Sequence, residues 1–330
     1  MHAVMHTLRH PSVFGFSIVA TCLFALFSPL SAEAGTFYVT ASSARTVDQI
    51  AEDGTPLPNL ISYPSGTNTT GIAVNSVGTI LVASSVNNSI YSVTPGGIST
   101  LYASGLPNNL AGMAFDSSDR LFVTTTDSTT PIGVVSSLGV YTALDIPDFT
   151  SYSATNLVFD ASGNLYVANT YDYAPAYNPH SVVKLTPTGA PEDPWTPSVF
   201  YDFAVGYQPG GMAFDDIGNL YVASFATNTI SKILPGGTLD GTFVLSGTAL
   251  SNPYGMTFAN GNLYSVDFGG TRVMEITLGG VASVFSTLTE TPSFIAYSAI
   301  PEPTSAALIL AGVVGLIATS SRRRLGRIGV

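Results

Sequence analysis

The chain has 330 residues, of which only 9% are charged, and its formal net charge is −11. The many Gly, Ser, Thr, Asn, Tyr and Val residues suit short β-strands joined by tight turns and are unfavourable for helices. Between Gly35 and Ile300, 19 Asp and Glu residues stand against 5 Lys and Arg, a net charge of −14. This excess excludes a nucleic-acid-binding surface, which needs clustered basic side chains.

The first 34 residues have the order of an export signal. Arg9 precedes the uncharged run Val13–Leu30, and a small-x-small triplet follows at 32–34. We therefore predict a signal peptide over 1–34, removed by signal peptidase before Gly35. A retained membrane helix is the alternative because the apolar run is long, and lipoprotein processing at Cys22 is a third. Cys22 is the only cysteine, so the mature body has no disulfide and no cysteine metal site.

A two-part unit recurs five times along the middle of the chain. Its first half reads GIAV, GMAF, NLVF, GMAF and GMTF, beginning at residues 71, 112, 156, 211 and 255. Its second half follows a few residues later as GTILVAS, DRLFVTT, GNLYVAN, GNLYVAS and GNLYSVD. The first halves are 41, 44, 55 and 44 residues apart. That period is typical of a four-stranded blade of a β-propeller.

The two ends of the body each carry half of this unit. Gly35–Thr40 matches a second half with no first half before it, and Phe294–Tyr297 matches a first half with nothing after it. We predict that the last strand completes the blade begun by the first. The fold is then an all-β, six-bladed propeller over residues 35–300, closed by its first and last strands, which leaves no open sheet edge.

The GMAF…GNLYVAS cadence resembles NHL repeats and the SMP/gluconolactonase (SGL) family of six-bladed propellers, over about residues 35–298. In enzymes of the gluconolactonase type, Glu, Asn or Asp residues just before the strand-opening glycine hold a divalent cation, and oxygen ligands of this kind suit Ca²⁺. The corresponding residues here are Thr70, Ala111, Thr155, Gly210, Tyr254 and Ser293. None is a carboxylate, so we expect neither that metal site nor catalytic residues of that type. A divergent Ca²⁺-dependent lactonase remains the alternative.

One face of the predicted ring collects aromatic and polar side chains. The loops that lead into the innermost strands open on the same face as the loops between second and third strands. The candidate ligand-binding residues are Tyr171, Tyr173, Tyr177, His180, Tyr207, Tyr254, Asp267 and Asn156. Tyrosine offers a flat apolar face and a hydroxyl, which suits contact with sugars or peptides. Packing between blades is the alternative for the tyrosines, and a solvated loop position is the alternative for His180.

Several Asp residues directly follow the first strand of the unit, as in FDASGN and FDDIGN. Asp caps a tight turn through its own carboxylate, so we predict that Asp116, Asp160 and Asp215 close turns on the opposite face of the ring. Ca²⁺ held by such turns is the alternative.

The tail after Ile300 combines three features in order: the motif Pro301, Glu302, Pro303; the uncharged run Ser305–Ser321; and the cluster Arg322, Arg323, Arg324. A helix of 17 residues spans roughly 25 Å, enough for a thin bilayer, with the arginines on the cytoplasmic side. The segment 301–330 resembles the PEP-CTERM sorting signal of Gram-negative bacteria. That resemblance implies recognition by an exosortase, a membrane peptidase, and then release or attachment at the cell surface. A plain tail anchor is the alternative.

These features together predict an exported propeller of the cell envelope or extracellular matrix. Before processing, the C-terminal helix at about 305–321 would hold it in the inner membrane. We expect a non-enzymatic binding or scaffold module, without a cofactor, whose partner is an extracellular polysaccharide or a surface protein. The rival from the enzyme class is the lactonase-type hydrolase with Ca²⁺ on the axis. A spacer or adhesin without a small ligand is the third reading.

Overall fold

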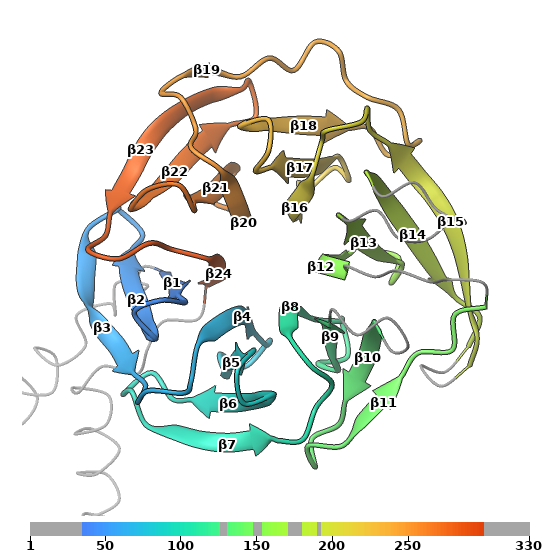
Figure 1. Cartoon of the computed structure of the whole chain (residues 1–330). Helices are drawn as coiled ribbons and strands as arrows, with labels where there is room; N and C mark the ends of the chain where they lie inside the picture. Colours follow the sequence, from blue (N-terminus) through green and yellow to red (C-terminus); the bar gives the residue numbers. More distant parts are fainter. Residues whose placement is uncertain (1–34, 126–130, 148–153, 171–179, 190–192, 300–330) are drawn as a thin grey trace, which may run out of the picture. The chain divides into compact units, whose positions relative to one another are not determined.

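The computed structural model describes residues 35–125, 131–147, 154–170, 180–189 and 193–299. These residues form strands β1–β24, arranged as six sheets around a central axis (Figure 1). The predicted all-β, six-bladed propeller is therefore confirmed. Both terminal segments, 1–34 and 301–330, lie outside the described residues, as do Tyr171, Tyr173 and Tyr177. The described part of the chain contains no helix that is long and apolar enough to cross a membrane.

Each blade runs outward from the axis through antiparallel strands. The innermost strands are β24 (Phe294–Ser298), β4 (Thr69–Val74), β8 (Leu110–Phe115), β12 (Ala154–Phe159), β16 (Pro209–Phe214) and β20 (Pro253–Ala259). The second strands are β1 (Thr36–Ala41), β5 (Ile80–Ser84), β9 (Leu121–Thr125), β13 (Leu165–Asn169), β17 (Leu220–Ser224) and β21 (Asn262–Asp267). These two sets are the two halves of the sequence unit.

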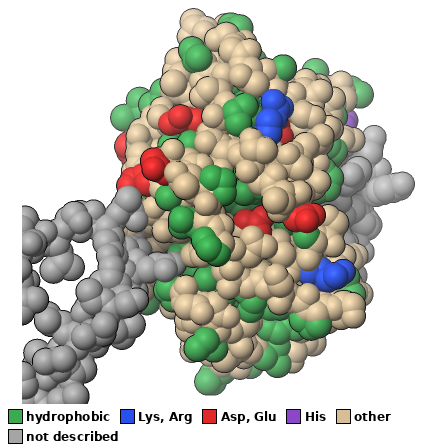
Figure 2. Space-filling model, turned by 90° about the vertical axis from the view of Figure 1, so that its left-hand side faces the viewer, with side chains coloured by type: hydrophobic (Ala, Val, Ile, Leu, Met, Phe, Trp, Pro, Cys, Tyr) green, Lys and Arg blue, Asp and Glu red, His purple; other side chains and the backbone are tan. Residues whose placement is uncertain are grey.

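The outer strands complete the blades. The third strands are β2 (Thr46–Ala51), β6 (Ser89–Val93), β10 (Ile132–Val135), β14 (Ser181–Pro187), β18 (Thr229–Ile233) and β22 (Arg272–Thr277). The outermost strands are β3 (Pro56–Ser62), β7 (Ser99–Ala103), β11 (Tyr141–Ala143), β15 (Trp195–Asp202) and β23 (Val281–Thr287). Figure 2 shows the ring from one side, where acidic and apolar side chains are interspersed among neutral polar ones and basic ones are sparse.

Two blades depart from the four-stranded pattern that the sequence period predicts. The fifth blade has three strands, β16-β17-β18. The chain after it forms the short strand β19 (Ser246–Gly247), which pairs in parallel with β23 of the sixth blade. Before that strand, Leu239 forms an isolated antiparallel bridge with Ile233, and Asp240 forms an ion pair with Lys232 of β18. The sixth sheet therefore has five strands.

The ring closes as predicted, because β24 is the innermost strand of the sheet that β1 begins. Their antiparallel register runs without a shift from Thr36 opposite Ser298 to Thr40 opposite Phe294. The Thr40 hydroxyl accepts a hydrogen bond from the Phe294 amide at 3.1 Å and donates to the Thr70 carbonyl of the next blade at 2.7 Å. The closing strand is thus tied to both neighbours.

The other five innermost strands share a register shift at the position of the unit's opening glycine, as between Pro209 and Met212. A Cβ at Gly211 would overlap the carbonyl oxygen of Tyr254 in the next blade, and one at Gly71 would overlap that of Ala111. Glycine is therefore required here because neighbouring innermost strands approach each other closely. Six apolar clusters fill the six seams between blades and form the core.

Candidate functional site

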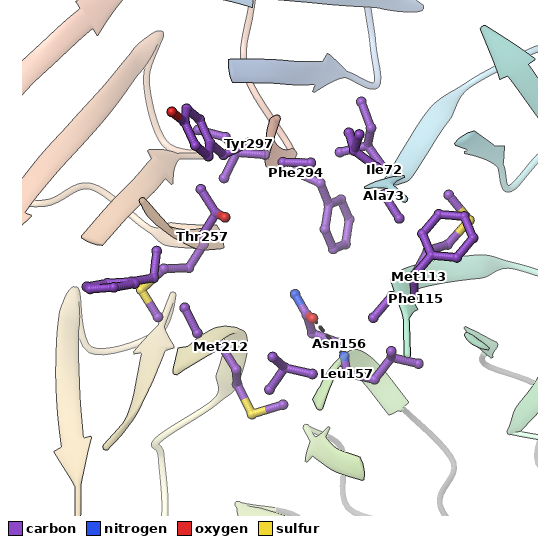
Figure 3. Close-up of a pocket in the computed structure, with 18 of the residues that line it drawn as sticks. Ile72, Ala73, Met113, Phe115, Asn156, Leu157, Met212, Thr257, Phe294 and Tyr297 are labelled. Carbon is purple, nitrogen blue, oxygen red and sulfur yellow. Dashed lines mark hydrogen bonds between the residues drawn. The ribbon is translucent and has the colours of Figure 1, made fainter. Parts of the chain in front are cut away.

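Two cavities lie along the axis of the ring. A channel of about 340 Å³ is lined by all six innermost strands (Figure 3). A second cavity of about 440 Å³ lies where those strands begin, and we call it the mouth cavity. Phe294 lines both and so marks their boundary. The mouth volume falls within the range of about 300–1,000 Å³ that small-molecule pockets occupy.

Inside the channel, two side chains stand where the other four innermost strands have glycine. Asn156 and Phe294 replace the opening glycine of β12 and β24. Figure 3 shows the Phe294 ring and the Asn156 amide directed toward the middle of the channel. The Asn156 Oδ1 accepts a hydrogen bond from the Leu157 amide at 2.7 Å, which leaves its Nδ2 facing the channel. Asn156 thus offers a hydrogen-bond donor on the axis.

Nine of the twelve described residues that line the mouth cavity come from two repeat positions. One is the residue before the opening glycine, and the other is the residue after the second strand. Its described lining is Ser42, Thr70, Ser85, Asn109, Leu110, Ala111, Thr155, Phe225, Tyr254, Phe268, Ser293 and Phe294. Both kinds of loop therefore open on one face, as expected.

One side of the mouth is aromatic. Tyr254 lies at the centre of this group, with its ring centroid 5.2 Å from that of Phe294 and 5.8 Å from those of Phe225 and Phe268. Phe268 is 50% exposed, which is unusual for a large apolar ring in the described surface. We call these four rings the aromatic shelf. They come from the fifth, sixth and first blades.

The opposite side of the mouth is neutral and polar. The Thr70 hydroxyl donates to the Leu110 carbonyl at 2.9 Å, so its oxygen is left to accept from a ligand. The Thr155 and Thr170 hydroxyls lie 2.8 Å apart, and Thr170 donates to the Pro209 carbonyl at 2.7 Å. These bonds join adjacent innermost strands and hold the polar groups in fixed positions.

Asp267 does not reach the mouth cavity, although it ends β21 on this face. Its carboxylate is fully buried, forms an ion pair with Arg272 and accepts the Ser251 amide at 3.0 Å. Burial raises the pKa of Asp267, and this effect exceeds the lowering by Ser251 and Arg272. The buried Asp267 carboxylate therefore stabilises the loop that carries Phe268.

Tyr207 is also a packing residue, and it lines neither cavity. It is 8% exposed, stacks on Phe203 with ring centroids 3.8 Å apart, and donates its hydroxyl to the Val222 carbonyl at 2.6 Å. His180 lies half-buried just before β14, where its carbonyl accepts the Phe203 amide, and it does not line either cavity. Tyr254 and Asn156 are the predicted residues that the structure brings to the axis.

The turn role of the repeated Asp residues is confirmed. Asp215 accepts the Ile217 and Asn219 amides at 3.1 and 2.8 Å, and Asp160 accepts equivalent bonds from residues 162 and 164. Asp116 does the same and also pairs with Arg120. These carboxylates are used within their own turns.

A gluconolactonase-like cation site would need carboxylate or amide oxygens among the mouth residues. The six positions before the opening glycine carry hydroxyls, a methyl, a glycine and a phenol, while Ca²⁺ sites in proteins depend on carboxylates. In the described part of the chain, no group of three or more His, Cys, Asp or Glu side chains gathers at the mouth. The donor set on the axis does not fit that cation.

Sequence reasoning missed Phe225 and Phe294 as mouth residues. Phe225 occupies the same repeat position as Phe268, directly after a second strand, so aligning the units at that position would have found it. Phe294 stands where four other units have glycine. In both cases the signal is a large ring at a position that other repeats fill with a small residue.

The comparisons with known proteins agree with this fold. No protein-family model and no curated protein matches the chain. Among solved structures, a chain of a nidogen/laminin complex superposes with a TM-score of 0.63 at 16% identity, covering 80% of this chain and 98% of that one. A gluconolactonase, XC5397 from Xanthomonas campestris, gives 0.59 at 19% identity, covering 78% and 89%. A streptogramin B lyase gives 0.56 at 17% identity, covering 81% and 89%.

At these identities the likeness concerns the fold. The chain is a six-bladed β-propeller whose structural neighbours include gluconolactonases and streptogramin-type lyases. Both enzymes and a partner-binding protein use this ring, so the activity has to be argued from the mouth itself.

Proposed function

We propose that this propeller is a non-enzymatic binding module of the cell surface or extracellular matrix, and that its mouth cavity binds an uncharged carbohydrate. The observation that carries the proposal is the division of the mouth into an aromatic shelf and a fixed hydroxyl side. A sugar ring has the matching division, since its C–H faces pack on aromatic rings and its hydroxyl edge exchanges hydrogen bonds. Its hydroxyls can donate to the Thr70 hydroxyl oxygen, which lines the mouth cavity.

The mouth's charge favours a neutral ligand. Among its described lining residues none is charged, and the body around it is strongly acidic. An anionic ligand would meet repulsion, and a cationic one would find no carboxylate partner in the lining. Asp267, which ends β21 on this face, is already paired with Arg272.

The tail supports a surface location. The order of Pro301–Pro303, apolar run and arginine cluster resembles that of a PEP-CTERM sorting signal. We propose that the chain is exported, held briefly in the inner membrane by its C-terminal helix and processed near the motif. A carbohydrate ligand fits that destination, since the envelope is where a polysaccharide would be met.

Binding is tested by titrating neutral polysaccharides and their oligosaccharides into the purified protein. Phe268→Ala removes an exposed ring of the shelf and should fold normally, whereas Tyr254→Ala removes its centre. Each should weaken binding at least about tenfold, the equivalent of roughly 1.4 kcal/mol. Leu138→Ala, on an 88% exposed residue away from the mouth, is the matched control. Equal affinity of all four proteins would refute a ligand site at the shelf.

The alternative, a lactonase-type hydrolase, is favoured only by the shared fold. It is tested by offering sugar lactones with added Ca²⁺ to the protein and to Asn156→Ala, which removes the polar group on the axis. Turnover that depends on Asn156 and Ca²⁺ would replace the binding proposal. Slow hydrolysis of the lactone that Asn156→Ala leaves unchanged would leave the binding proposal in place.

The sorting proposal has its own measurement, mass spectrometry of the mature C-terminus from native cells. We expect a terminus close to Pro303. Recovery of intact chain ending at Val330 would refute processing, and it would leave the binding proposal to be judged on the titrations.

A further inference from the structure

The seam between the sixth blade and the blade that closes the ring contains a group of oxygen atoms that the fold does not use. Thr46, Asp48 and Ile50 pair with alternate residues of β1, so their side chains share one face of β2. Ile50 packs in the apolar cluster of this seam together with Val273 of β22. Ser286 is the register partner of Val273 and so faces the same seam from β23.

All of these polar atoms are buried and lack hydrogen-bond partners. Asp48 is 4% exposed, Thr46 6% and Ser286 5%. Neither carboxylate oxygen of Asp48 has a partner, and the same holds for the hydroxyls of Thr46 and Ser286. A buried polar atom without a partner costs about 1–3 kcal/mol, and a buried lone charge costs more. Four such atoms facing one seam are best explained by a bound group.

The charge of that group follows from the surroundings of Asp48. Asp48 is the one carboxylate among these residues, and none of the ion pairs of the described residues includes it. The nearest basic residue in the sequence, Arg45, has a buried Nε with no partner and does not pair with Asp48. The seam therefore offers negative oxygens and lacks a counter-charge.

We propose that this seam holds a hard metal cation of the Ca²⁺ type, bound by the Asp48 carboxylate and the Thr46 and Ser286 hydroxyls. Carboxylate and neutral oxygens are the ligands that Ca²⁺ takes, and water can fill the remaining positions. The site is separate from the mouth cavity. It would fasten β23 to β2 where the chain crosses to β24, so it would act on closure of the ring.

The test is a thermal melt of the full-length protein in mild detergent, after chelation, with Ca²⁺ alone added in steps. The wild type should gain about 5–10 °C at Ca²⁺ concentrations around a hundred times the dissociation constant. Asp48→Asn keeps the shape and removes the charge, so the gain should disappear. Ser286→Ala should weaken Ca²⁺ binding without abolishing it. Asp53→Asn is the matched control, because Asp53 is an exposed turn residue bonded to Thr55 on the same blade, and it should keep the full gain.

Two results would overturn the proposal. One is that Ca²⁺ does not change the Tm of the wild type. If the stability of the wild type then rises as the pH falls, and Asp48→Asn removes this pH dependence, Asp48 is held protonated instead of binding a cation. The other is an equal Ca²⁺ gain in Asp48→Asn, which would place the cation elsewhere. If Asp48→Asn fails to fold, Ser286→Ala and isothermal titration of Ca²⁺ into the wild type carry the same decision.

Discussion

Removing the guanidinium of Arg272 should lower the stability of the protein, because Arg272 neutralises a buried carboxylate next to the mouth face. Arg272 pairs with the fully buried carboxylate of Asp267 and also donates to the Ala249 carbonyl at 3.1 Å. In Arg272→Met, Asp267 keeps the Ser251 amide but loses its only ion-pair partner among the described residues. Breaking a buried pair from one side costs about 3–5 kcal/mol. We expect about 3, because the Arg272 side chain is 30% exposed and water can replace part of the interaction.

This loss corresponds to a fall in Tm of about 6–12 °C for a domain of this size. The pH dependence gives a second readout. The pKa of Asp267 is already raised above its ordinary value of 3.8, and loss of Arg272 raises it further. Between the pKa of Asp267 in the unfolded chain and its higher pKa in the native state, the native state holds a proton that the unfolded state has lost. Stability therefore rises as the pH falls through this range. The deficit of Arg272→Met should therefore narrow as the pH falls toward 4.

The assay is denaturant unfolding at several pH values, read by tyrosine fluorescence. Asp267→Asn combined with Arg272→Met should recover much of the loss, since no buried charge remains. Arg120→Met is the control, because Arg120 is 43% exposed and its partner Asp116 keeps two backbone amides, so the cost should stay below about 1 kcal/mol. A cost below 1 kcal/mol for Arg272→Met, or a deficit that does not change with pH, would refute this account of Asp267.

Two further predictions concern the ring. Gly211→Ala should destabilise the protein by roughly 1–3 kcal/mol, because the new methyl group would overlap the Tyr254 carbonyl, whereas Gly236→Ala, with open space around it, should have little effect in the same urea titration. A chain ended before β24 should lose cooperative unfolding in calorimetry and associate through the exposed edge of β1, as measured by light scattering. A monomeric product whose melt is unchanged would contradict closure of the ring by β24.

The architecture could be read from the sequence because it repeats. Each unit must bury the same faces against its neighbours, so the pattern of small, apolar and turn residues recurs at a fixed period, and the half-units at the two ends predict their own pairing. The departure at the fifth blade could not be read this way. β19 is two residues long, and it pairs in parallel with β23 of the next blade, whereas the other described strand pairs are antiparallel.

The site was less predictable than the fold because residue type does not determine which way a side chain faces. The repeat pattern puts both Tyr207 and Tyr254 just before the body of an innermost strand, yet only Tyr254 lines the mouth. Tyr207 lies two residues before β16 and turns into the seam with Phe203, while Tyr254 lies within β20 at the shifted register. A register shift of this kind changes the direction in which a side chain points, and it cannot be predicted from the local sequence.

Position within the repeat separates residues that serve the ring from residues that serve a ligand. Where the neighbouring innermost strand lies too close for a Cβ, as at Gly71 and Gly211, the residue is fixed by sterics and carries no information about a partner. Asn156, Phe268 and Phe294 break the pattern at positions where a smaller or simpler residue satisfies the ring elsewhere. A side chain that the fold does not require, placed on the axis or at its mouth, has to be explained by what the axis binds. The same reasoning separates Asp48 from the turn carboxylates, since those are satisfied by their own loops while Asp48 is buried without any partner.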